Sequence, residues 1–136
     1  MLTGGCLCGQ VRYAYRGEVG PSIYCHCNDC RRITGSAFNV GVRLEHAQFT
    51  LTAGTTKGFT KQADSGNELT RHFCANCGSP LYSSAPRNRS FIYVKAGTVD
   101  DPTLIEPASQ SWVTSKVKWA DIDDSLPSYP KGNTRY

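Results

Sequence analysis

Short segments in which apolar and polar residues alternate run through the first two-thirds of the chain. Residues 9–15 show the pattern clearly, with Val11, Tyr13 and Tyr15 at alternate positions. Because successive side chains of a strand point to opposite faces of a sheet, this pattern predicts a half-buried β-strand. Similar segments lie at residues 37–42, 49–52, 68–73 and 90–95, and residues 54–59 indicate a turn into a further strand.

These predicted strands are short and are separated by turns rich in glycine, of which the chain has 13. Such an arrangement is typical of a mainly β fold of the sandwich or barrel-like kind. The chain has 136 residues, no internal repeat and no linker long enough to divide it. We therefore expect a single domain over residues 1–136, with a short helical turn at 102–105 and an extended tail at about 126–136.

The charge and hydropathy of the chain favour neither a membrane nor a nucleic acid as partner. No segment approaches the roughly 18 apolar residues of a membrane span, and the first residues do not form a secretory leader. The formal charge is +4, and counting seven cysteines as thiolates with two bound zinc ions lowers it to +1. The basic residues form no run of five or more. We expect a cytoplasmic protein, and the sequence does not indicate its oligomeric state.

Seven cysteines are gathered in three clusters, spaced as C-L-C, C-H-C-N-D-C and C-A-N-C. They are Cys6, Cys8, Cys25, Cys27, Cys30, Cys74 and Cys77. An odd number of cysteines without an export leader argues against a disulfide scaffold, and buried structural thiols would be scattered along the chain. Ligation by sulfur alone favours zinc, because an iron–sulfur cluster would leave three cysteines without a function.

Local geometry explains how neighbouring cysteines can bind one ion. If the C-L-C and C-H-C pairs lie on strands, the two sulfurs of each pair point to the same face. The C-A-N-C segment instead predicts a turn that closes on a metal, and Gly78 can adopt the left-handed conformation that such a turn needs.

Two groupings of the seven sulfurs are compatible with zinc. In the first, the C-L-C and C-A-N-C pairs form a four-cysteine site, and Cys25, Cys27 and Cys30 form a compact triplet. In the second, Cys27 and Cys30 join the C-A-N-C pair, which leaves Cys6, Cys8 and Cys25; spacing favours the first. In either case a four-cysteine zinc is closed and structural, whereas a three-cysteine zinc keeps one position for water or for a substrate atom such as a thiol.

Three blocks of the sequence resemble the glutathione-dependent formaldehyde-activating enzyme family, also called the centromere protein V family. The blocks are GCLCGQVRY at residues 5–13, CHCNDCRR with TGSAF at 25–32 and 34–38, and RHFCANCGSPLY at 71–82. A weaker match, AGTVDDP, lies at 96–102. Family members often carry a histidine shortly before a late tryptophan, where this chain has Gln110-Ser111-Trp112.

The resemblance implies a fold, two metal sites and an activity. The fold would be a β-tent of twisted antiparallel sheets, and the activity the reversible addition of glutathione to formaldehyde. This reaction gives S-(hydroxymethyl)glutathione and is classed with the carbon–sulfur lyases. A catalytic zinc on Cys25, Cys27 and Cys30 would activate or position the glutathione thiol. The resemblance places a structural zinc on Cys6, Cys8, Cys74 and Cys77.

Two other functions remain open at this point, namely a non-catalytic zinc-stabilised binding module and a thiol or metal sensor that loses zinc on oxidation. Outside the cysteines, Arg31 and Arg32 are either surface charges or residues that hold an anionic ligand. We expect His26 to support the metal site without binding the ion, and His72 to lie on an exposed strand face. We expect Trp112 and Trp119 to be packing residues and not a binding platform.

Overall fold

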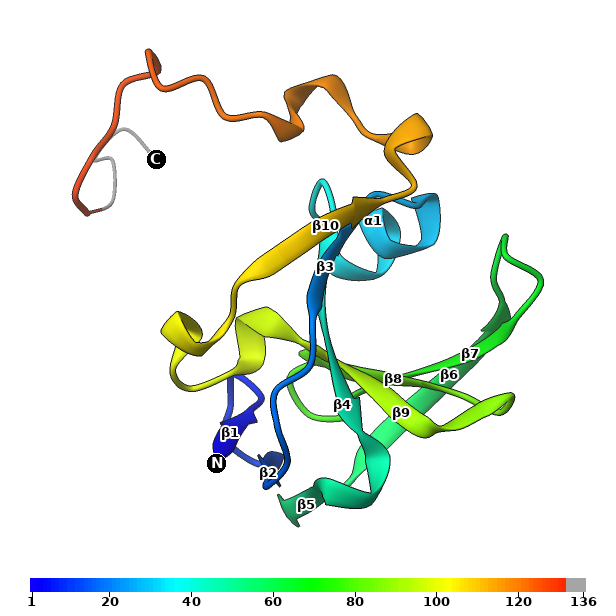
Figure 1. Cartoon of the computed structure of the whole chain (residues 1–136). Helices are drawn as coiled ribbons and strands as arrows, with labels where there is room; N and C mark the ends of the chain where they lie inside the picture. The colour runs from blue at the N-terminus through cyan, green and yellow to red at the C-terminus, as the bar shows by residue number, and fades with distance from the viewer. Residues whose placement is uncertain (132–136) are drawn as a thin grey trace.

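The computed structural model describes residues 1–131, which form ten strands in two sheets (Figure 1). The smaller sheet has the order β1-β2-β5 and is antiparallel throughout. Its strands are β1 (Leu2–Gly5), β2 (Arg12–Tyr15) and β5 (Phe49–Ala53). The prediction of a mainly β fold with twisted sheets is therefore confirmed.

The larger sheet has seven strands in the order β10-β3-β4-β9-β8-β7-β6. All neighbours in it are antiparallel except β10 and β3, which are parallel, so the sheet is mixed. Its strands are β3 (Ser22–Cys25), β4 (Asn39–Glu45), β6 (Thr56–Gln62), β7 (Glu68–Cys74), β8 (Pro80–Ala85), β9 (Asn88–Lys95) and β10 (Pro107–Ser111).

Helical segments are short. The α-helix α1 (Asn28–Thr34) follows β3 and ends at Gly35, whose φ of 62° is the left-handed conformation of a helix C-terminus. The predicted turn near residue 102 is the 3₁₀ helix η3 (Pro102–Leu104), capped by the Asp101 carboxylate, which accepts from the Thr103 N–H. Two other 3₁₀ helices, η1 (His46–Gln48) and η2 (Ala96–Thr98), follow β4 and β9. No helix within residues 1–131 is long and apolar enough to cross a membrane.

The apolar core lies between the two sheets. Val42 and Leu44 of β4 pair with Val94 and Ile92 of β9, so all four side chains project from the same face of the larger sheet. They are almost fully buried against the smaller sheet, whose Tyr13 and Tyr15 have the alternate spacing seen in the sequence. The core members are Leu2, Cys6, Val11, Tyr13, Tyr15, Val42, Leu44, Cys74, Leu81, Ile92, Val94 and Val99.

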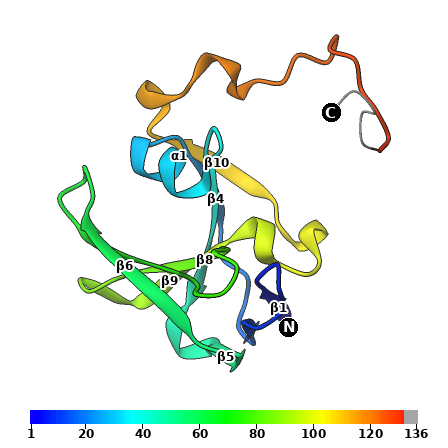
Figure 2. The same ribbon diagram turned by 180° about the vertical axis from the view of Figure 1, so that it is seen from behind.

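The segment after β10 first passes the end of the larger sheet, where Lys116 and Ala120 line a pocket with Tyr24 of β3, and its last part then extends away from both sheets (Figures 1 and 2). It contains the 3₁₀ helices η4 (Val113–Ser115) and η5 (Lys118–Ala120). Trp112 and Trp119 are 42% and 66% exposed, so the prediction that they are packing residues is wrong. Residues 126–131 form no regular element, and the rest of the predicted tail, residues 132–136, lies outside the described residues.

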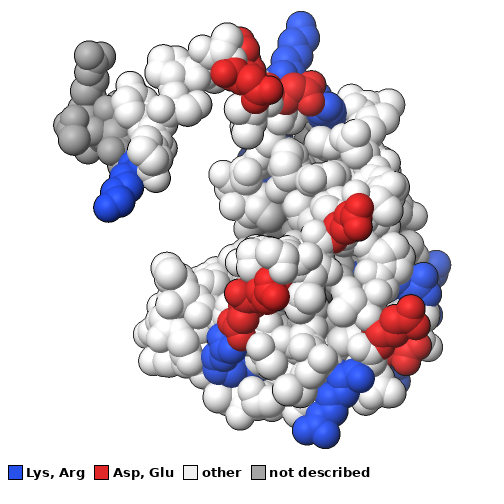
Figure 3. Space-filling model, turned by 60° about the vertical axis from the view of Figure 1, so that its left-hand side comes forward, with Lys and Arg blue, Asp and Glu red and all other residues white. Residues whose placement is uncertain are grey.

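Charged side chains of both signs are interspersed on the face shown in Figure 3. This distribution agrees with the scattered placement of lysine and arginine along the chain. The charges that bear on the site are the buried ones, which are described below.

Candidate metal centres and the adjoining cavity

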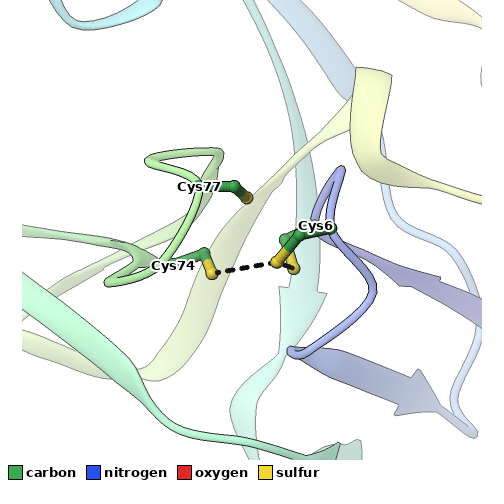
Figure 4. Close-up of side chains that lie close together, drawn as sticks. Cys6, Cys74 and Cys77 are labelled. Atoms are coloured by element: carbon green, nitrogen blue, oxygen red, sulfur yellow. Dashed lines mark hydrogen bonds between the residues drawn. The ribbon is translucent and has the colours of Figure 1, made fainter.

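Four cysteine sulfurs converge where the loop after β1 meets the turn between β7 and β8 (Figure 4). The sulfurs of Cys6, Cys8, Cys74 and Cys77 all lie within 4.8 Å of one another. The Cys6–Cys8 distance is 3.5 Å and the Cys8–Cys74 distance is 3.8 Å. Sulfurs at the corners of a zinc tetrahedron, with Zn–S bonds of about 2.3 Å, are about 3.8 Å apart. The donor set and its spacing therefore fit a closed zinc site.

Hydrogen-bond donors directed at these sulfurs favour their thiolate form. The Val11 N–H donates to the Cys6 sulfur at 3.2 Å. The Ser79 side chain and N–H, together with the Cys8 N–H, lower the pKa of Cys77 to about 5. Gly78, which follows Cys77, has a φ of 76°, so the predicted left-handed turn is present.

The remaining three sulfurs form a separate group at the junction of β3 and α1. The sulfurs of Cys25, Cys27 and Cys30 lie within 4.8 Å of one another. Cys25 is the last residue of β3, and Cys27 is the N-cap of α1, where its sulfur accepts from the Cys30 N–H at 3.3 Å. The seven sulfurs therefore form the first of the two predicted groupings.

Close packing couples the thiols of this triplet. A hydrogen bond from the Cys30 thiol lowers the pKa of Cys25 to about 5, and the same interaction raises the pKa of Cys30. Three sulfurs held this closely suit a cation that replaces their protons, which is the arrangement of a zinc with three protein ligands.

One part of the geometric prediction is wrong. Cys8 lies in a turn after β1, and Cys27 caps a helix, so neither the C-L-C nor the C-H-C pair lies on a strand. Chain reversal and helix capping, in place of strand alternation, bring the sulfurs of each pair together.

A cavity of about 200 Å³ adjoins the triplet on the face of the larger sheet that lies opposite the core. Two of its lining residues, Arg71 and Lys95, are cations that are only 6% and 7% exposed. Burial lowers the pKa of Lys95, and the nearby Cys30 opposes this shift. The lining comprises Ile23, Cys25, Cys30, Asn39, Gly41, Leu69, Arg71, Ser83, Tyr93, Lys95 and Ser111.

The two buried cations were not predicted as site residues from the sequence, from which Arg31 and Arg32 were the candidates for binding an anion. Arg32 lines an outer groove that shares Arg71 with the cavity, and neither Arg31 nor Arg32 lines the cavity itself. The one signal in the sequence is the position of Lys95 at the end of the apolar strand β9, where a charge is unusual.

Two histidines can now be compared with their predictions. His26 is 2% exposed and its Nε2 lies 2.8 Å from Gln110 Oε1, whereas it does not belong to either sulfur group. His26 therefore lies outside the candidate ligand sets, and its supporting role stays a prediction. His72 is half-buried and stacks on Tyr82 with ring centroids 4.3 Å apart, so its prediction as an exposed residue is wrong.

The fold and the two sulfur groups define a class: mainly β proteins with one four-cysteine and one three-cysteine candidate metal centre. Comparison with known proteins narrows this class. The sequence profile of the glutathione-dependent formaldehyde-activating enzyme family matches residues 1–115. The chain belongs to this family.

Two relatives illustrate the likeness. A Halomonas elongata protein that carries the name of the same family is 27% identical over 132 residues, which cover 90% of this chain and 82% of the relative. A crystal structure of a Rhodobacter sphaeroides protein has a TM-score of 0.60 at 17% identity, and the match covers 80% of this chain and 99% of that one. The second comparison supports the fold alone.

Proposed function

We propose that this chain is a zinc-dependent enzyme of the carbon–sulfur lyase class. Its reaction would be the reversible addition of glutathione to formaldehyde, giving S-(hydroxymethyl)glutathione, or the formation of a related thiol adduct. The observation that carries the proposal is the convergence of three sulfurs beside a cavity, while four other cysteines form a complete set elsewhere. Family membership and the name of the Halomonas relative support the choice of glutathione and formaldehyde.

The two sulfur groups would hold two zinc ions with different roles. Cys6, Cys8, Cys74 and Cys77 supply four ligands, which saturate a tetrahedral ion and leave it structural. Cys25, Cys27 and Cys30 supply three ligands and leave one position for a substrate. Zinc bound there would lower the pKa of a substrate thiol and so keep it as a thiolate at neutral pH.

The chain's own residues would orient the reactants. Cys25 and Cys30 line the cavity, so a thiol near them would lie against the apolar walls formed by Ile23, Leu69 and Tyr93. In the addition, the thiolate sulfur forms a bond to the carbonyl carbon, the C=O π pair moves to the oxygen, and that oxygen takes up a proton. The proton that the thiol loses passes to solvent, so the reaction consumes no other reagent.

All seven cysteines are free thiols in the structure, which suits a reducing compartment such as the cytoplasm. The binding-module and sensor alternatives use the same sulfurs but need no cavity beside them. The cavity next to the triplet is therefore the feature that favours an enzyme.

Nuclear magnetic resonance with ¹³C-formaldehyde tests the proposal. At equilibrium with glutathione, the exchange rate between hydrated formaldehyde and the hydroxymethyl adduct is measured with and without the zinc-loaded protein. We expect the protein to raise this rate about tenfold or more, and the Cys30→Ser variant to leave it at the uncatalysed value. A fully zinc-loaded, folded protein that leaves the rate unchanged would contradict the proposal.

A further inference from the structure

The wall of the cavity beside the triplet carries two cations, Arg71 and Lys95. Arg71 and Ser83 are paired across β7 and β8, and Ser83 is paired with Tyr93 across β8 and β9. Paired residues project from the same face of a sheet, and Lys95 lies two residues beyond Tyr93, so it shares that face. The strands thereby place two positive charges on the wall that the cysteines also line.

Lys95 is buried without a hydrogen-bond or ion-pair partner within the described residues, although the nearby triplet cysteines favour its charged form. It is 7% exposed, yet its ammonium group takes part in no hydrogen bond and in none of the ion pairs within residues 1–131. A buried charge is costly unless it is paired. The opposite position in the register is Gly41, which has no side chain, so open space remains beside the lysine.

The one charged partner of Arg71 within the described residues is the Asp29 carboxylate, which also binds Lys61. Its Nη2 atom lies 3.6 Å from Asp29 Oδ2, which is longer than a hydrogen bond. The other carboxylate oxygen of Asp29 accepts a hydrogen bond from Lys61 Nζ at 2.6 Å. Asp29 therefore faces two cations, and the planar guanidinium of Arg71 keeps donors for a further acceptor.

The two reactants of the proposed function differ in their need for these two cations. Formaldehyde is neutral and has no group that needs two cations. The amide of Asn39 and the hydroxyls of Ser83 and Ser111 also line the cavity and add neutral donors beside the charges. Such a combination of a guanidinium, an ammonium and neutral donors is suited to a carboxylate.

We propose that Lys95 and Arg71 bind a carboxylate, so that the triplet takes thiols that also carry a carboxylate. The proposal rests on the part of the proposed function that places a thiol at the triplet, and it does not depend on formaldehyde turnover. Glutathione belongs to this class through its glycine carboxylate. Smaller mercapto acids belong to it as well and fit a cavity of about 200 Å³.

A matched pair of thiols tests the carboxylate. Isothermal titration calorimetry on the zinc-loaded protein compares 3-mercaptopropionate with its methyl ester, which keeps the thiol and the carbon chain but lacks the charge. We expect the acid to bind the wild-type protein about tenfold or more tightly than the ester, because hydrogen bonds between charged groups in a buried site are strong. Equal Kd values for acid and ester would overturn the proposal.

Variants then test the residues. The Lys95→Met and Lys95→Gln variants should reduce the preference for the acid to about twofold or less, and Lys95→Arg, which keeps the charge, should retain most of it. Lys57→Met is the matched control, because Lys57 is exposed, lies outside this cavity and forms no ion pair with Asp29, so its loss should leave the preference unchanged. A preference that survives in both neutral Lys95 variants would overturn the proposal.

Two further results would also overturn it. If the neutral Lys95 variants bind one zinc ion fewer per chain, the lysine compensates the thiolates and does not recognise a ligand. If glyoxylate binds without any thiol and this binding needs Lys95, the recognised carboxylate belongs to the aldehyde partner. Unchanged NMR exchange of formaldehyde with a retained acid preference would reject the proposed reaction while leaving this inference intact.

Discussion

The two groups of cysteines differ in what they connect along the chain. Cys6 and Cys8 follow the first strand, whereas Cys74 and Cys77 lie more than 60 residues later, so one ion at this site would join distant segments. Cys25, Cys27 and Cys30 lie within six residues, so an ion there closes only a local turn. A cross-link between distant segments restricts the unfolded chain far more than a local one does.

The two groups of cysteines also differ in their surroundings. Cys6 and Cys74 belong to the apolar core between the sheets, so the four-sulfur group is part of the packing that defines the fold. The triplet instead borders a cavity with two buried cations. Under the proposed function, stability and reactivity would be divided between the two groups, although both consist of the same side chain.

The largest difference between the two groups is expected when one cysteine is removed from each. Cys74→Ser should abolish cooperative unfolding or lower Tm by at least about 15 °C, because the ion that joins distant segments is lost. Cys27→Ser, the matched control, should lower Tm by about 5 °C or less. Thermal melts followed by circular dichroism measure both, and equal losses would refute the division of roles.

Chelation should separate the two ions in the unmodified protein. A chelator that reports released zinc by absorbance should remove one equivalent quickly, from the three-cysteine site, while the far-ultraviolet dichroism stays unchanged. The second equivalent should leave only as the dichroism is lost, because four thiolates bind zinc more tightly and the fold depends on them. Release of both equivalents in one phase would mean that the sites are equivalent.

A smaller effect is expected from the residue that hydrogen-bonds His26, which lies between two cysteines of the triplet. Gln110 Oε1 lies 2.8 Å from His26 Nε2, and His26 Nδ1 has no hydrogen-bond partner within the described residues. Gln110→Ala should therefore cost about 1 kcal/mol of stability and weaken zinc binding at the triplet only. Urea unfolding and zinc competition measure the two effects, with exposed Ser109→Ala as control. A change confined to the four-cysteine site would contradict this account.

The smallest effect concerns an ion pair near the four-sulfur group. Arg12 and Thr3 hydrogen-bond the Asp100 carboxylate and lower its pKa. Because both groups of this ion pair are partly exposed, Asp100→Asn should cost less than about 1 kcal/mol.

The pH dependence of that effect has a definite sign. A carboxyl group with a lowered folded-state pKa stabilises the fold above its unfolded pKa of about 3.9, and this contribution is lost as the pH falls through the folded value. The difference in unfolding free energy between wild type and Asp100→Asn should therefore stay constant from about pH 8 to about pH 5. Urea titrations across this range measure it, and a difference that varies with pH would show that another group is involved.

Much of the fold and of the sulfur grouping could be predicted from the sequence. The alternation at Val11, Tyr13 and Tyr15 reflects burial on one face of a sheet, which is a local property of the chain. The preference for the triplet of Cys25, Cys27 and Cys30 followed from their short spacing, which limits how far apart the sulfurs can lie.

The placement of Arg71 and Lys95 on one wall of the cavity could not be predicted, because it depends on strand register. The β7–β8 pairing shifts between His72 and Phe73, and the β8–β9 pairing shifts between Ser84 and Ala85. A shift of one residue moves a side chain to the other face of a sheet, so sequence alone does not place Arg71 beside Lys95. Trp112 and Trp119 were mispredicted for a different reason, since an apolar side chain does not by itself reveal whether a terminal segment packs.

Zinc content is the most direct test of the central claim that the chain holds one closed and one open metal site. Elemental analysis of protein purified without chelator should give two zinc ions per chain, and the variant with Cys25, Cys27 and Cys30 all changed to serine should keep one ion and the wild-type dichroism. A wild-type value of one, or a triple variant that loses both ions and unfolds, would contradict the account.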